Sequence, residues 1–276
     1  MTPDYEIYKN YNPNAKREIV VEDYLFGSAQ RLEQMLEFLG ANKSEFLKTF
    51  IQEISKKLSV NAKSMNIGQF AELIEKQLQK LPLLKSHSPL GDLVFPFVLG
   101  ELNLAEFTEK ATVLHLESEK GENLLLYHAL KIMVDLLGRE EGIQLYKGFV
   151  DYRIKNSPPR EVDDFRVARV SWIKGMADSG GYEFAIYDFD ESKFLGRFDK
   201  CVVYDSLKDM EDAALGYYVT CYAGSTGCNL SDWCVRMRRT QTLFTADFCD
   251  ELYWDRHVYN EPEQPSLDFT RKLVVE

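Results

Sequence analysis

The sequence predicts an α+β protein, with a helical N-terminal half followed by an antiparallel sheet covered by helices. In the first half, apolar residues recur at spacings of three and four, which indicates amphipathic helices. In the second half, apolar and polar residues alternate over short segments, which is typical of strands. Two consecutive prolines within Asn156–Arg160 separate the patterns, because prolines cannot continue a helix.

The helical half predicts several elements in order. Residues 1–18 are polar, and we expect them to form a loosely held arm. The segment 83–100 contains prolines and glycines, so we expect a connection there. Periodicity, together with stop signals such as Gly40, Pro82 and Gly138, predicts helices at about residues 21–40, 44–58, 67–81, 104–116, 122–137 and 140–154.

The second half predicts two hairpins. One joins strands at 182–189 and 194–203 through a turn at 190–193, and the other joins 235–244 to 248–253. A short acidic helix is expected at 207–215. Two segments stay open: 165–172 fits a strand or the start of a helix, and 217–222 fits a short strand or a buried helix segment.

Composition and charge limit the classes of function. The 276 residues are 45% hydrophobic and 28% charged, as in ordinary globular proteins. The net charge of −11 argues against a nucleic-acid partner, because neutralising phosphates requires a basic face. No apolar run approaches the roughly 18 residues of a membrane span, so no membrane partner is expected. The chain start shows no signal-peptide pattern, and with reduced cysteines we expect a cytoplasmic protein.

All five cysteines lie between Cys201 and Cys249, and this clustering requires an explanation. A disulfide framework is disfavoured because the number is odd and no secretion signal is visible. A zinc site usually shows a close Cys-x2-Cys pair, which is absent, although His257 leaves open a site assembled in space. Reactive or substrate-facing thiols in a small-molecule pocket, and simple buried packing, are the other two possibilities.

The cysteine region also resembles a known family. The resemblance covers roughly residues 120–260, and it is carried by Cys201, Cys221, Asn229, Arg239, Thr240, Thr242, Cys249 and Asp250. The pattern is similar to that of the L-2-amino-thiazoline-4-carboxylic acid hydrolase family, itself distantly similar to the 4-vinyl reductase domains. The chain departs from it at Tyr222–Ser225, where members often have an acidic residue, and at Ala246, where a glycine is usual. The resemblance implies a division into a helical N-terminal region, 1–118, and an α+β domain, 119–276.

The resemblance implies an enzyme of small-molecule metabolism, in a biosynthetic pathway, that hydrolyses a C–N or C–S bond of a heterocyclic or amino-acid-derived substrate. It implies catalytic roles for Cys201, Cys221, Cys249 and Asp250. It implies substrate binding by Arg239, Thr240, Thr242 and Asn229. No cofactor and no metal ligand are assigned. The alternative is a non-catalytic small-ligand or metal-binding module of the 4-vinyl reductase type.

The residues allow this chemistry under geometric conditions. Opening an aminothiazoline ring requires a nucleophile such as a thiolate, a proton for the leaving group and a cation for the substrate carboxylate, for which Arg239 is suited. Strand alternation places Arg239 on the apolar side, and Thr240 and Thr242 on the other. Asp250 would face away from its neighbour Cys249, so it is not that thiol's direct base and could pair with an arginine instead. The helical half has two candidate roles, closing the pocket or forming the face of a homodimer.

Overall fold

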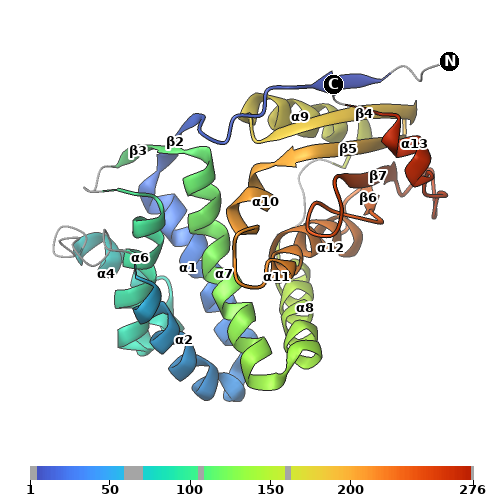
Figure 1. Ribbon diagram of the computed structural model, residues 1–276. Coiled ribbons are helices and arrows are strands. Elements are labelled where there is room, and N and C mark those ends of the chain that lie inside the picture. The colour runs from blue at the N-terminus through green and yellow to red at the C-terminus, as the bar shows by residue number, and fades with distance from the viewer. Residues whose placement is uncertain (1–4, 59–70, 105–108, 159–162, 275–276) are drawn as a thin grey trace. The chain divides into compact units, whose positions relative to one another are not determined.

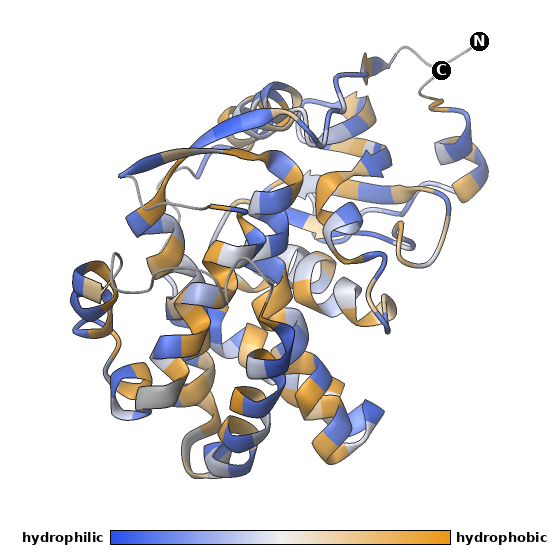
Figure 2. Cartoon of the chain, turned by 60° about the vertical axis from the view of Figure 1, so that its left-hand side comes forward, coloured by the Kyte–Doolittle hydropathy of each residue, from blue (hydrophilic) through white to orange (hydrophobic). Residues whose placement is uncertain are grey.

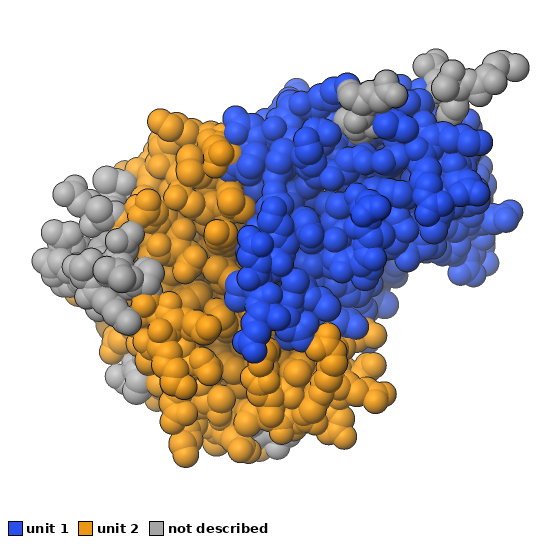
Figure 3. All heavy atoms as spheres, viewed as in Figure 1, with its two compact units in different colours: residues 1–13, 150–276 blue, residues 14–149 orange. Residues whose placement is uncertain are grey.

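The computed structural model describes residues 5–58, 71–104, 109–158 and 163–274. It confirms the α+β class, with a helix-rich N-terminal half and an antiparallel sheet flanked by helices (Figure 1). The chain divides into two compact units: unit 1 holds residues 1–13 and 150–276, and unit 2 holds residues 14–149 (Figure 3). The boundary expected between residues 118 and 119 falls inside helix α7 (His115–Leu137). Within the described ranges, no helix has the length and apolar character needed to cross a membrane.

Unit 2 is mainly helical. Its helices are α1 (Val21–Leu39), the 3-10 turn Gly40–Asn42, α2 (Lys43–Lys57), α4 (Ala71–Leu78), α5 (Pro82–Ser86), α6 (Ser88–Glu101), α7 and the first part of α8 (Arg139–Lys155). Strands β2 (Lys16–Val20) and β3 (Lys110–Leu114) form a separate two-stranded antiparallel sheet. Figure 2 shows orange and blue alternating along single helices, as the amphipathic periodicity predicts.

Three expectations for this region are wrong. The segment 83–100 is helical rather than a connection, because a proline in the first turn of α6 removes no intrahelical hydrogen bond and Pro96 lies within a buried helix. Residues 110–114 form a strand rather than a helix, and 16–20 form its partner rather than a loose arm. Two parts of the expected helices lie outside the described residues. They are residues 67–70, at the start of the helix expected at 67–81, and residues 105–108, within the helix expected at 104–116.

Unit 1 contains a five-stranded antiparallel sheet with the order β1-β4-β5-β7-β6. Its strands are β1 (Glu6–Tyr8), β4 (Tyr182–Asp190), β5 (Lys193–Cys201), β6 (Val235–Arg238) and β7 (Cys249–Asp255). Both predicted hairpins are present, as the β4–β5 and β6–β7 pairs. Strand β6 stops at Arg238, earlier than expected. The helices of this unit, besides the end of α8, are α9 (Phe165–Ser179), α10 (Val202–Leu207), α11 (Ala214–Tyr217), α12 (Ala223–Leu230) and α13 (Leu267–Arg271).

The side chains of the sheet alternate between two apolar layers. Phe184, Phe198 and Tyr253 pack in one layer, which also contains residues of α9. Leu252 and Leu273 pack in the other layer, on the opposite face of the sheet. The first layer surrounds the cavity described below.

The two open segments are both helical. Residues 165–172 open α9, which Asp164 caps by accepting hydrogen bonds from the backbone N–H groups of Arg166 and Val167. Residues 218–222 form a π-helical turn between α11 and α12. The acidic helix expected at 207–215 is not formed, because α10 ends at Leu207 and turns precede α11.

Candidate functional site

Unit 1 contains a cavity of about 360 Å³. It is bounded by one face of the sheet, by α9, by the π-helical turn and by α12. This volume lies near the lower end of the roughly 300–1,000 Å³ that is typical of small-molecule sites.

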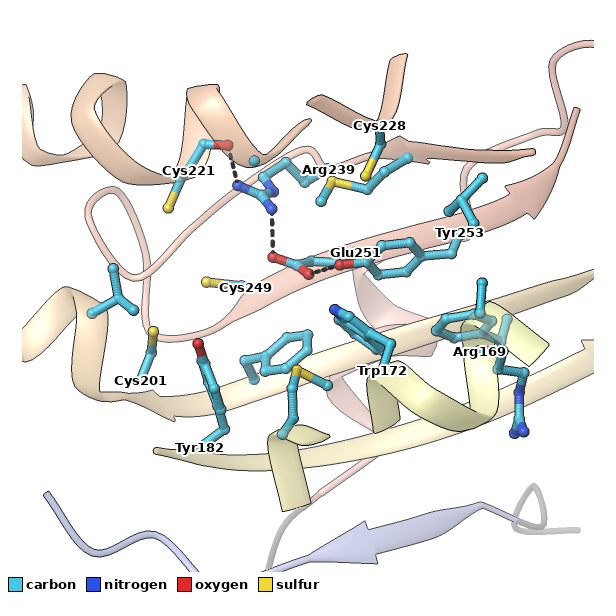
Figure 4. A pocket seen from close by; sticks show the side chains of 18 of the residues that line it. Arg169, Trp172, Tyr182, Cys201, Cys221, Cys228, Arg239, Cys249, Glu251 and Tyr253 are labelled. Carbon is cyan, nitrogen blue, oxygen red and sulfur yellow. Dashed lines mark hydrogen bonds and ion pairs between the residues drawn. The ribbon is translucent and has the colours of Figure 1, made fainter. Parts of the chain in front are cut away.

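Three thiols from distant points of the chain reach this cavity. Cys201 ends β5, Cys221 lies on the π-helical turn and Cys249 begins β7. Figure 4 shows their sulfur atoms gathered at one end of the cavity. Cys228 of α12 also lines the cavity, although the family pattern does not include it. Cys234 is fully buried and lies outside the cavity lining, as a packing role predicts.

A buried ion pair forms part of the cavity wall. The Nη2 atom of Arg239 lies 2.7 Å from Oε1 of Glu251, and the two side chains are only 9% and 12% exposed. Arg239 Nη1 donates a hydrogen bond to the carbonyl oxygen of Cys221, at 2.8 Å. The hydroxyl of Tyr253 donates to Oε2 of Glu251 (Figure 4). The pair therefore ties β6 and β7 to the π-helical turn.

Sequence reasoning missed Glu251, although a signal for it was present. Cys249, Glu251 and Tyr253 are spaced by two along β7, and all three line the cavity. Because successive side chains of a strand point to opposite faces, a strand that presents Cys249 also presents Glu251. The same alternation explains why Arg239 joins Val235 and Met237 in the lining.

The ion pair keeps Arg239 charged inside the protein. Burial is the largest single influence and would lower the pKa of this guanidinium, but the Glu251 carboxylate, together with Cys221, Tyr253 and Cys249, raises it above its ordinary value. A buried charge is tolerated only when it is paired and hydrogen-bonded, and both conditions hold here.

Burial keeps the thiols of the cavity in their neutral form and so lowers their reactivity. It raises the pKa of Cys201 to about 12, although nearby backbone N–H groups of Tyr204 and Val203 act against it. Burial also raises the pKa of Cys221, partly offset by the positive charge of Arg239. It raises that of Cys249 too, with a further contribution from the Glu251 carboxylate. The three thiols are therefore protonated at neutral pH, and a thiol is a much weaker nucleophile than a thiolate.

Aromatic rings form another part of the cavity wall. The rings of Phe194 and Tyr253 are stacked with centroids 4.8 Å apart and an angle of 12° between their planes. The Trp172 ring lies 4.7 Å from that of Tyr253 and 6.1 Å from that of Phe198. All four residues line the cavity, which therefore offers flat apolar surfaces beside the polar ion pair.

Asp250 does not line the cavity. It is completely buried and accepts hydrogen bonds from the backbone N–H groups of Thr240 and Gln241, the hydroxyl of Thr240 and the side-chain amide of Gln264. It faces away from Cys249, as strand alternation predicts. The suggested pairing of Asp250 with an arginine is wrong, because its neighbour across the β5–β7 pair, Arg197, is bonded to Asp199.

The polar residues expected to bind substrate lie outside the cavity lining, except for Arg239. Asn229 binds the backbone N–H and carbonyl of Met237, which joins α12 to β6. Thr240 is held by Asp250, and Thr242 is buried in the loop after β6. The structure thus brings together Cys201, Cys221, Cys249 and Arg239, and separates them from Asn229, Thr240, Thr242 and Asp250.

In the part of the chain that the structure describes, no group of three His, Cys, Asp or Glu side chains is arranged to hold a metal ion. In comparisons with known proteins, no family model, no curated protein and no solved structure matches this chain.

Proposed function

We propose that unit 1 binds a small molecule with flat, mainly apolar rings. The observation that carries this proposal is the cavity, which combines aromatic walls with a buried ion pair and four thiols. Small-molecule sites usually have this composition, in which apolar side chains supply most of the contact area and a few polar groups fix orientation.

The buried ion pair supports a ligand-binding role over simple core packing. Apolar side chains of similar volume would stabilise a core at least as well as a buried Arg–Glu pair does. Here the pair instead borders an open volume beside Trp172 and Tyr253. The polar groups are thus placed where they can contact a bound molecule.

The test uses N-phenyl-1-naphthylamine, an uncharged aromatic dye whose fluorescence rises in apolar surroundings. We expect saturable binding of one dye per chain, and slower alkylation of Cys221 and Cys249 by iodoacetamide when dye is bound. Cys234 is the internal control, because it is buried outside the cavity and its alkylation rate should not change. Absence of saturable binding, or equal protection of all three thiols, would contradict the proposal.

A cysteine-dependent hydrolase is the second candidate, and one observation favours it. Arg239 donates to the carbonyl of Cys221, and its positive charge lowers the pKa of that thiol against the effect of burial. Cys221 is therefore the nucleophile that we propose for this activity, with Glu251 as the carboxylate in the same cavity. Loss of 2-amino-thiazoline-4-carboxylate over time tests it: Cys221→Ser should abolish turnover, whereas Cys234→Ser should not. Absence of turnover by the unmodified protein would leave binding as the function.

A further inference from the structure

We propose that the molecule bound in this cavity is uncharged, and that the Arg239–Glu251 pair selects against both anions and cations. This inference rests on the binding function proposed above and specifies the class of ligand. Its basis is the balance of charge in the cavity wall.

Among the described residues that line the cavity, the charges cancel. Arg239 and Glu251 contribute one positive and one negative charge, and they contact each other directly. Arg169 also lines the cavity, but its guanidinium is bonded to Asp188, with Nε and Nη2 at 2.9 and 2.5 Å from the carboxylate oxygens. Burial keeps Cys201 and Cys249 protonated and therefore neutral.

A charged ligand would disturb this balance. An anion that takes Arg239 as its partner leaves the Glu251 carboxylate unpaired, and a cation that takes Glu251 leaves the guanidinium unpaired. In each case one charge, about nine-tenths buried, is left without its partner, and this is costly in a poorly solvated site. An uncharged ligand can enter while the ion pair stays intact.

The wall still offers hydrogen bonds to an uncharged polar group. Oε1 of Glu251 is paired with Arg239 and Oε2 accepts a hydrogen bond from Tyr253, which leaves lone pairs on the carboxylate for a ligand N–H or O–H. Among the described residues, no group accepts a hydrogen bond from the buried Nε–H of Arg239, so the guanidinium keeps a donor that a carbonyl oxygen could satisfy. An aromatic ring that carries an amide-like edge meets these requirements together with the flat walls formed by Trp172 and Tyr253.

Three naphthalene derivatives of matched shape test this inference. Naphthalene-2-carboxamide is neutral, naphthalene-2-carboxylate is an anion and naphthalene-2-carboxamidine is a cation at pH 7. Each is used to displace N-phenyl-1-naphthylamine from the complete chain. We expect the carboxamide to displace the dye at concentrations lower by about tenfold or more than either charged compound requires, which corresponds to about 1.4 kcal/mol.

Two variants should reverse this selectivity. Glu251→Gln leaves the guanidinium unpaired, so the carboxylate should become the best competitor. Arg239→Gln leaves the carboxylate unpaired, so the amidine should become the best. Arg238→Gln is the matched control, because this neighbouring guanidinium binds Glu261 and the carbonyl of Pro262 and lies outside the cavity lining, so the original order should persist.

The outcomes separate the two proposals. If the dye does not bind the unmodified protein, the binding function itself is wrong. If the dye binds but a charged competitor displaces it as well as the carboxamide does, only the charge inference is overturned. An unchanged order in both ion-pair variants would also overturn it, and the ranking in the unmodified protein decides even where a variant fails to fold.

Discussion

Arg239 and Glu251 form an ion pair inside unit 1, with 2.7 Å between Nη2 and Oε1, at the wall of a cavity that four cysteines also line. Arg239 directly follows β6 and Glu251 lies within β7, and the pair also fixes the carbonyl of Cys221 on the π-helical turn. The pair therefore has a structural role, and the ligand selection proposed above is a second role that can be measured separately.

The structural role predicts strong coupling between the two side chains. Arg239→Met and Glu251→Gln should each lower the free energy of unfolding by about 3–5 kcal/mol, because each leaves one buried charge without its partner. The double variant should lose clearly less than the sum, since no charge remains stranded. Urea unfolding of the four proteins gives the coupling energy, and additive losses would show that the pair is not formed.

Asp250 is expected to stabilise the loop after β6. Asp250→Asn should lower the free energy of unfolding by about 2–3 kcal/mol. The buried carboxylate accepts charge-assisted hydrogen bonds from the backbone N–H groups of Thr240 and Gln241, both at 2.8 Å, and an amide would replace one acceptor with a donor. Asp247→Asn, at an exposed position in the same loop, is the control and should change the stability little. Thermal unfolding measures both, and full stability of the Asp250 variant would exclude this structural role.

The buried thiols predict a loss of stability at high pH. The pKa of Cys201 is raised from 9.0 to about 12, so the unfolded chain releases this proton at a lower pH than the folded chain does. The stabilisation is therefore complete below pH 9 and is lost as the pH rises through 12. When the pH rises from 8 to 10, the free energy of unfolding of Cys201→Ala should fall by about 1 kcal/mol less than that of the unmodified protein. Equal losses in urea unfolding would show that this thiol titrates normally in the folded state.

The charge of Arg239 should control the reactivity of Cys221. Removing it in Arg239→Gln should raise the pKa of the Cys221 thiol further, because the cation that opposes the effect of burial is lost. The rate of iodoacetamide alkylation of Cys221, followed against pH by mass spectrometry, should shift to higher pH in this variant. Arg238→Gln should leave the profile in place, and a shift of equal size there would point to a general loosening of the fold.

The sequence predicts those parts of the fold that depend on local patterns. The helices near residues 21–40, 122–137 and 140–154 have a clear period, and the turn at 190–193 lies between two alternating strands. Strands β2 and β3 were missed because their paired residues lie 90 to 98 positions apart in the sequence and no local turn links them. Helix α6 was missed because its prolines and glycines resemble those of a loop.

Part of the candidate site could also be predicted, because it depends on the local alternation of side chains along strands. Strand alternation places Arg239 with Met237 and separates Asp250 from Cys249, and both expectations hold. Trp172 could not be placed, because the segment 165–172 fits a helix or a strand equally well. The pKa shifts of the thiols depend on enclosure by all the walls together, and sequence spacing carries no information about enclosure.

The most direct measurement of the central claim is dye binding to two tryptophan variants of helix α12. Gly224 lines the cavity, and a Cβ added there meets no atom within 4 Å, so Gly224→Trp should occupy the ligand volume without a steric clash at its Cβ. Gly227 on the same helix has equally open space around an added Cβ but does not line the cavity. We expect N-phenyl-1-naphthylamine to bind Gly227→Trp as it binds the unmodified protein, and not to bind Gly224→Trp. Equal binding by the two variants would contradict a ligand site in this cavity.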